Sequence, residues 1–280
     1  INFTLNGISL AEPEDAGLYT SNYTDFLSNV NSIQVQRGVG ITPNNISNLV
    51  GSVNFEGPNL CDTAYTSLQT GYGSFNSSRV SAGFNTGITK SGFAAYGRFS
   101  NIYSDGYRYN SGTNANTFFA SIGYYKKKDI FKFTAFSGKS KNQMAYVATS
   151  IDDIKRDPRT NYLSPDERDD FNQQFVQLQH TRQTGKNSLL TSSIYYVGLQ
   201  GQYGVLFSPS IYNFSLFSDL YGAMSTWSVL KNNLSFKIGI NGYSYYRNHS
   251  MAVSPSLSQS LYSNRGNKTE LSAFTKISYS

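Results

Sequence analysis

The sequence is poor in the residues on which disulfide, metal and catalytic chemistry depend. It has one cysteine, Cys61, and two histidines, His180 and His249, in 280 residues. A single cysteine excludes an internal disulfide and a multi-cysteine metal site, and two separated histidines argue against a zinc site. No Ser/His/Asp pattern surrounds either histidine, and the carboxylates occur in polar loops, not as an isolated pair. We therefore expect no enzyme activity, no cofactor and no metal.

Charged residues and long apolar runs are also scarce. Charged residues make up 14% of the chain and hydrophobic residues 39%, against roughly 25% and 45–50% for a soluble domain. No apolar run approaches the roughly 18 residues of a transmembrane helix. The formal charge is +6, yet the basic residues are scattered or lie in short clusters such as Lys126–Lys128. We therefore expect no nucleic-acid partner.

Aromatic and small polar residues take the place of charge. The chain has 22 Tyr, 19 Phe and 24 Gly. Disordered chains lack aromatic residues, so disorder is excluded. A sheet with lipid on one face and uncharged polar side chains on the other would have this composition.

From about residue 63 the sequence alternates between apolar and polar positions, which is the period-two pattern of strands. The stretch near residue 84 shows the separation: one face carries Val80, Ala82, Phe84, Thr86 and Ile88, and the other carries Arg79, Ser81, Gly83 and Asn85. The stretch near residue 238 separates in the same way. We predict about ten strands, starting near residues 64, 78, 92, 117, 129, 172, 188, 217, 233 and 268.

The connections between these strands are uneven. Short turns at "ITKSG", "KKKD", "TGKNS" and "KNN" alternate with long polar segments near 104–116, 138–171, 200–216 and 246–267. An antiparallel membrane barrel has tight turns on one rim and long loops on the other. A soluble β-sandwich or a lipocalin-like barrel also alternates along its strands, so both stay open. Aromatic residues near the predicted strand ends favour the membrane barrel: Tyr124, Tyr125, Phe131, Phe133, Tyr195, Tyr196, Tyr243, Tyr245 and Tyr246.

Residues 1–62 form a separate unit of short strand-like pieces between polar loops. The "RGVG" stretch from Arg37 to Gly40 resembles a phosphate loop only superficially. A phosphate loop needs a third glycine or a Lys-Ser/Thr pair and a following helix, and Pro43 interrupts any helix start there. The glycines instead permit a tight turn at positive φ.

Several pieces between Thr4 and Pro58 resemble the second half of the plug domain of TonB-dependent outer-membrane receptors, in the form typical of Bacteroidetes. They are "NGI", "PED", "DF" before "SIQVQRGVG", and "GSVN". Downstream, "YGSFNSSRVSAGFNTG" and "FSNIYSDGYRYNS" resemble the first barrel strands and the second extracellular loop of that family. The resemblance implies an all-β transmembrane antiparallel barrel from 63 to 280, with an α+β plug segment, residues 1–62, inside it. It also implies that carboxylates of the barrel wall hold Arg37, while Gly38 and Gly40 shape the plug turn.

The chain departs from this family in two ways. "PNNISNLVGSVN" replaces the run of small residues with a Gly pair that relatives usually carry before the "VN" strand. About ten strands at roughly 22 residues each would be less than half of a 22-stranded barrel, which needs roughly 480 residues at that rate. We therefore expect the chain to be a fragment that lacks the first part of the plug and the segment that engages TonB.

The resemblance implies uptake of a scarce ligand through the outer membrane of a Gram-negative bacterium. The partners would be TonB, outer-membrane lipids and an unknown small ligand, with a surface lipoprotein as a further candidate. A passive pore, a structural barrel component of a larger assembly and a soluble all-β binding module are the alternatives. Tyr and Arg at a loop mouth provide large, rigid contacts, although these residues could equally serve to pack the plug or order the loop. The expected ligand contacts are Glu12, Glu14, Asp15, Tyr19, Asp105, Tyr107, Arg108 and Tyr109.

Overall fold

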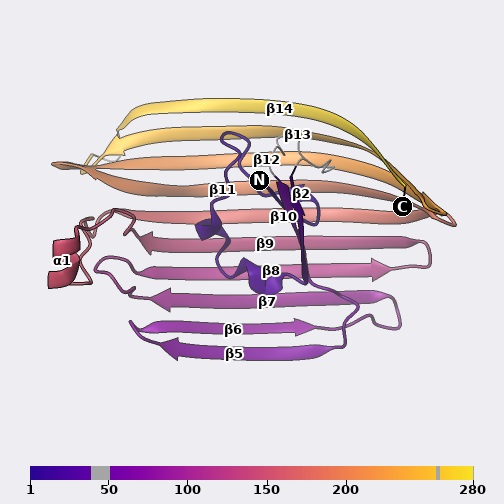
Figure 1. The fold of residues 1–280 in the computed structure, drawn as a ribbon, viewed down its shortest axis with the longest axis horizontal. Helices are drawn as coiled ribbons and strands as arrows, with labels where there is room; N and C mark the ends of the chain where they lie inside the picture. The colour runs from indigo at the N-terminus through magenta and orange to yellow at the C-terminus, as the bar shows by residue number, and fades with distance from the viewer. Residues whose placement is uncertain (39–50, 257–258, 280) are drawn as a thin grey trace.

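The computed structural model describes residues 1–38, 51–256 and 259–279, which form two β-sheets. The larger sheet, here called the wall, has ten strands in chain order, each antiparallel to the next (Figure 1). The ten predicted strands are thus confirmed. Their bounds are β5 Tyr65–Gly73, β6 Ser77–Asn85, β7 Phe93–Ser104, β8 Thr113–Tyr125, β9 Asp129–Gln143, β10 Arg168–Gly185, β11 Ser188–Phe207, β12 Ser210–Lys231, β13 Leu234–Val253 and β14 Ser260–Tyr279.

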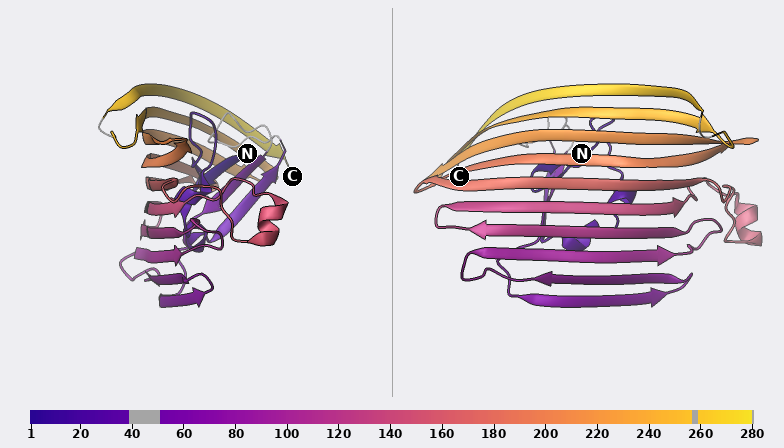
Figure 2. Two further views of the ribbon diagram at one scale, coloured as in Figure 1. Left: turned by 90° about the vertical axis from the view of Figure 1, so that its left-hand side faces the viewer. Right: turned by 180° about the vertical axis from the view of Figure 1, so that it is seen from behind.

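The N-terminal segment, residues 1–56, forms the smaller sheet in the order β2-β1-β4-β3. Its strands are β1 Asn2–Leu5, β2 Ile8–Ser9, β3 Ser32–Arg37 and β4 Gly51–Glu56, with 3₁₀ helices η1 Thr20–Tyr23 and η2 Phe26–Asn29 between β2 and β3. The segment lies on one face of the wall (Figure 2). We call this face the inner face and the opposite one the outer face.

The two sheets share one apolar core. Leu5 and Ile8 of the N-terminal segment are almost fully buried, as are Phe119 and Phe175 of the wall. The Tyr23 ring stacks on Phe136 with centroids 5.7 Å apart. Each such buried side chain contributes roughly 1.5–3 kcal/mol, so the segment is packed against the wall and is not merely tethered to it.

Side chains of the wall separate by face as the alternation predicts. On β7 and β8 the inner face carries small polar residues, and Ser100 and Thr117 are buried and joined by a 2.6 Å hydrogen bond. The outer face of the same strands exposes Phe99 and Phe118, at 52% and 49%. Large apolar side chains that remain this exposed over a whole sheet indicate a surface that lipid covers.

One rim of the wall carries the connections from β5 to β6, from β7 to β8 and from β9 to β10. Only some of the long loops predicted for this rim are present. The connections at 105–112 and 144–167 are long, and the latter contains the short helix α1, Ile151–Arg156. The predicted long loops at 200–216 and 246–267 are wrong, because strands occupy most of both ranges and β11 joins β12 through residues 208–209 alone. Gly, Ser and Asn occur in both ranges, and Pro209 and Pro255 lie within them, so both ranges read as loops in the sequence.

The strand β3 ends at Arg37. It is an edge strand of the small sheet, and all six of its residues are exposed. Arg37 forms no ion pair with a described residue, and its pairing with carboxylates of the wall stays a prediction. Gly38 has φ +79°, which confirms the tight turn there, and Gly40 lies outside the described residues.

No helix in the part of the chain that the structure describes is long and apolar enough to cross a membrane.

Candidate functional site

One carboxylate of the N-terminal segment forms ion pairs with two arginines of the wall. Asp25 lies just before η2, and its oxygens are 2.6 Å from Arg79 Nη2 on β6 and 2.7 Å from Arg98 Nη1 on β7. Burial acts to raise the pKa of Asp25, but hydrogen bonds from Ser100 and Ser28 and the Arg98 guanidinium outweigh it, so this pKa lies below its ordinary value. Asp25 is therefore ionised and fixes η2 to the wall.

A second carboxylate, Glu12, anchors the loop after β2. It is buried, accepts a 2.8 Å hydrogen bond from Tyr245 Oη on β13, and lies 3.4 Å from Arg247 Nη1. Burial raises the pKa of Glu12, and the contacts with Tyr245 and Arg247 only partly oppose this. Glu12 was expected to contact ligand. In the structure it packs the N-terminal segment against the wall.

The rest of this loop faces solvent. The Glu14 carboxylate lies 2.7 Å from Arg247 Nε, although the N–H does not point at it. Asp15 accepts hydrogen bonds from Tyr19 Oη and from the Gly17 backbone N–H. Burial acts to raise the pKa of Asp15, but these two bonds outweigh it and lower the pKa, while the same Asp15 contact raises the pKa of Tyr19 to about 12. The exposed face of the loop thus presents two anionic carboxylates and a phenol.

The second predicted group lies at the rim, in the loop between β7 and β8. Asp105 accepts 2.6 Å hydrogen bonds from Tyr103 Oη and Asn76 Nδ2. Tyr107 packs edge-on against Phe75 with centroids 5.4 Å apart. These contacts bind the loops after β5 and β7 to each other.

Arg108 and Tyr109 join the same rim to the loop between β9 and β10. Arg108 donates to the carbonyls of Ala145 and Thr160, at 2.8 and 2.9 Å. Its guanidinium also bonds Val147 and Thr149. Tyr109 is half exposed and lies under the Arg159 guanidinium, 4.7 Å from the ring centroid. Arg108 therefore orders the loop, whereas Tyr109 and Tyr107 leave ring surface open.

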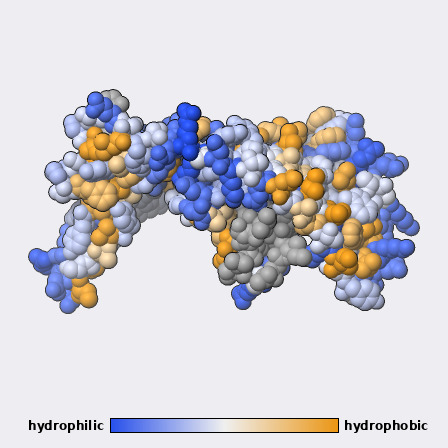
Figure 3. Space-filling view, turned by 90° about the horizontal axis from the view of Figure 1, so that it is seen from above, coloured by the Kyte–Doolittle hydropathy of each residue, from blue (hydrophilic) through white to orange (hydrophobic). Residues whose placement is uncertain are grey.

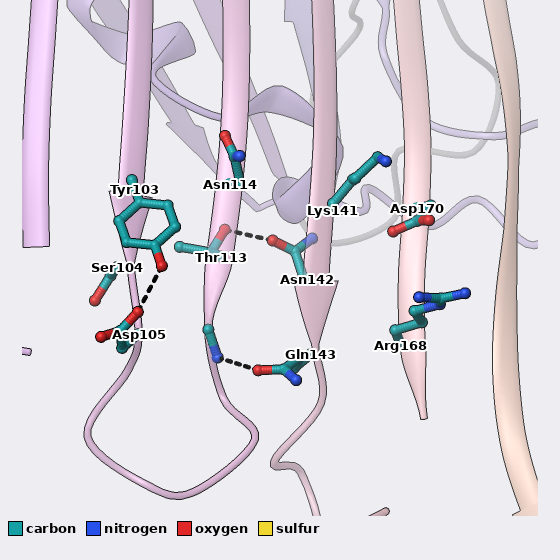
Figure 4. A pocket seen from close by; sticks show the side chains of 11 residues that line it. Tyr103, Ser104, Asp105, Thr113, Asn114, Lys141, Asn142, Gln143, Arg168 and Asp170 are labelled. Carbon is teal, nitrogen blue, oxygen red and sulfur yellow. Dashed lines mark hydrogen bonds between the residues drawn. The ribbon is translucent and has the colours of Figure 1, made fainter. Parts of the chain in front are cut away.

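A hollow of about 430 Å³ opens at the strand ends below this loop. Figure 4 shows Tyr103 and Asp105 at one side of it and Lys141, Arg168 and Asp170 at the other. On β7, β9 and β10 these residues alternate with the inward-facing ones, so the hollow lies on the outer face.

The structure does not bring the two predicted groups together. The first contacts β12 and β13, the second lies after β7, and four strands separate β7 from β12. Five strand spacings correspond to roughly 24 Å across the sheet. No contact between the groups is present among the described residues.

Sequence reasoning missed the arginines that hold the N-terminal segment. The expectation placed an arginine on the plug and carboxylates on the wall, and the structure has carboxylates on the segment and Arg79, Arg98 and Arg247 on the wall. The alternation did place Arg79 on the polar face, which was the available signal. No grouping of three His, Cys, Asp or Glu side chains suited to a metal occurs within residues 1–38, 51–256 and 259–279.

Solved outer-membrane proteins have the same fold. The ferric citrate transporter FecA in its unliganded form matches with a TM-score of 0.80 and 14% identity, over 100% of this chain and 45% of that one. The ferric yersiniabactin uptake receptor FyuA from Yersinia pestis matches with a TM-score of 0.80 and 16% identity, over 99% and 45%. The copper transporter OprC gives 0.77 and 12%, over 99% and 44%. No protein-family model matches the sequence, and neither does any curated protein.

These similarities define the fold. The chain is an all-β antiparallel sheet of ten strands with the fold of part of the barrel in these solved structures, and its N-terminal segment lies on the inner face. The predicted fold class is confirmed. The chain spans about 45% of the length of the solved structures that it matches.

Proposed function

We propose that the chain belongs to a TonB-dependent transporter of a Gram-negative outer membrane, which takes up a scarce small ligand. The observation that carries this proposal is the position of the N-terminal segment against the wall. It covers the inner face of an outwardly apolar wall and is held there by the shared apolar core and by the Asp25 and Glu12 contacts. A plug that is held by such non-covalent contacts can be moved by an external force.

Further parts of the proposal rest on the sequence resemblance. Residues 1–62 would be the C-terminal part of the plug domain and residues 63–280 the N-terminal part of the barrel, in a receptor of the Bacteroidetes type. TonB would act through a segment outside residues 1–280. A surface lipoprotein would be a further partner at the long-loop rim.

The proposed ligand contacts have two roles. Glu14, Asp15 and Tyr19 expose polar groups on the plug loop, and Tyr107 and Tyr109 expose rings at the rim. Glu12, Asp105 and Arg108 would position these groups through the bonds described above. Similar solved receptors and transporters are named for ferric citrate, ferric yersiniabactin and copper, and this variety supports a small ligand without selecting one.

A passive pore is the second candidate, because a polar gap lies between the two sheets. It has a volume of about 490 Å³, and the side chains that line it are largely uncharged and polar, including Asn6, Gln34 and Asn54 of the segment and Gln179 of the wall. Water could fill such a gap without any plug movement.

Uptake measurements separate these functions. The full-length protein would be produced in a strain that lacks its own receptors, with and without TonB, and accumulation of candidate chelates and sugars would be measured. We expect uptake only with TonB, and heat-modifiable migration of the protein in membrane fractions. Equal uptake without TonB would favour the pore, and a water-soluble protein would overturn both.

A further inference from the structure

The rim that carries the short turns has a different charge from the rim that carries the long loops. Four connections form the short-turn rim: 86–92, 126–128, 186–187 and 232–233. They contain five lysines and no acidic residue, and a sixth lysine ends β12. The six are Lys90, Lys126, Lys127, Lys128, Lys186 and Lys231.

These lysines are exposed and have no carboxylate partner among the described residues. Two acids neighbour this rim. Asp129 lies 2.9 Å from His180 Nε2 and 3.7 Å from Arg182 Nη1, and Asp62 accepts a 2.6 Å hydrogen bond from Asn59. On the opposite rim, residues 144–167 contain five acidic and three basic residues. Positive charge therefore accumulates at the short-turn rim. Figure 3, which is coloured by hydropathy, shows hydrophilic and hydrophobic residues mixed over the surface seen from above.

Outward-facing aromatic residues lie directly beside the lysines. Phe93 and Tyr124 stack with centroids 4.3 Å apart, and Lys126 Nζ lies 5.0 Å from the Tyr124 ring centroid. Trp227, four residues before Lys231, is also on the outer face and donates to Thr184 Oγ1 at 3.2 Å. Tyr and Trp rings of this kind lie at the level of lipid headgroups. The lysines thus lie just beyond the level at which the hydrocarbon core of a membrane would end.

We propose that the short-turn rim binds the anionic phospholipid headgroups of the adjoining leaflet. Six unpaired ammonium groups beyond an aromatic layer match a surface of phosphates in sign and in position. Juxtamembrane lysines are attracted to anionic lipid, and this attraction weakens within a Debye length. The inference rests on the proposed function, because it requires the wall to span a membrane.

Lipid retention tests the inference. The full-length protein would be reconstituted in nanodiscs of phosphatidylcholine with about 20% phosphatidylglycerol, where each lysine adds attraction for anionic lipid. Native mass spectrometry would then give the ratio of the two lipids that stay bound. We expect at least about fivefold enrichment of phosphatidylglycerol, which falls toward the bulk ratio at high salt.

Two triple variants provide the comparison. Lys126→Gln, Lys127→Gln and Lys128→Gln together are expected to reduce the enrichment by at least about threefold. The control is Lys139→Gln, Lys141→Gln and Lys155→Gln, three exposed and unpaired lysines near the other rim, which should retain the enrichment.

Equal retention of both lipids by the unaltered protein, or an equal loss in the two triple variants, would overturn the inference. Heat-modifiable migration reports on barrel formation separately. A protein without heat-modifiable migration would contradict the proposed function. A folded barrel that shows no lipid preference would overturn only the inference about the rim.

Discussion

At the scale of single residues, the two carboxylates that hold the N-terminal segment differ in their electrostatics. Asp25 meets two guanidinium groups, and its pKa is lowered despite burial. Glu12 is also buried, and burial raises its pKa despite Tyr245 and Arg247. The two anchors should therefore respond in opposite directions to the loss of charge.

Asp25→Asn should weaken the attachment of the segment. Arg98 is buried and would lose its counter-charge, while the exposed Arg79 contributes less. We expect a loss of about 2–3 kcal/mol, measured as a lower urea concentration at which residues 1–56 become protease-sensitive. The control Asp62→Asn removes an exposed carboxylate whose one side-chain partner among the described residues is Asn59, at 2.6 Å, and should leave the midpoint unchanged. An unchanged midpoint in Asp25→Asn would contradict the assigned role.

The same assay should depend on pH through both anchors. Asp25 has a pKa below its ordinary 3.8, so its contribution is complete above 3.8 and is lost as the pH falls through the lowered value. Glu12 has a pKa above its ordinary 4.5, so its contribution is complete below 4.5 and is lost as the pH rises through the raised value. Asp25→Asn should remove the acid decline and Glu12→Gln the alkaline one. A pH profile unaffected by either variant would refute these signs.

At the scale of elements, the strands were predictable where one face is apolar and the other polar. The starts of β9 and β11, at 129 and 188, agree with the prediction. β12 and β14 begin at 210 and 260, not near 217 and 268, because Pro209 and Pro255 lie shortly before them and Ser and Asn recur among their first residues, so both stretches read as loop. The Asp25 anchor could not be predicted, since it joins positions 54 and 73 residues apart.

Arg108 should control the order of the loop between β9 and β10. Its planar guanidinium bonds four residues of that loop at once. A lysine cannot reproduce this fork. Both Arg108→Ala and Arg108→Lys should increase proteolytic cleavage within 144–167 by about tenfold or more, since bonds to a charged group contribute about 1.5–3 kcal/mol. Arg156→Ala, which removes only an exposed ion pair with Asp153, serves as the control. If Arg108→Lys left the cleavage rate unchanged, the forked guanidinium would not be needed to order the loop.

At the scale of the whole molecule, transport should require the N-terminal segment to move against the wall. Arg79 Nη2 on β6 lies 2.7 Å from the exposed Ser28 Oγ. In a Cys61→Ser background, Ser28→Cys with Arg79→Cys can be joined by a short bis-maleimide. We expect this cross-link to stop uptake, while the same variant without reagent transports.

The control for this cross-link lies within the wall. Ser77 and Ser104 on β6 and β7 are 2.8 Å apart through their hydroxyls, so Ser77→Cys with Ser104→Cys joins two strands that move together. Uptake should continue in the control. Full uptake in a completely cross-linked Ser28/Arg79 pair would mean that ligand passes a stationary plug.

Strand length increases along the wall, from 9 residues in β5 and β6 to 22 in β12. The difference corresponds to roughly 43 Å along a strand, or roughly 30 Å along the membrane normal at the usual tilt. If the short turns mark a level base, the other ends of the strands rise from β5 and β6 toward β12. Under the proposed function, a bulky ligand would meet the lowest part of this rim beside β5 and β6, close to Tyr107 and Tyr109.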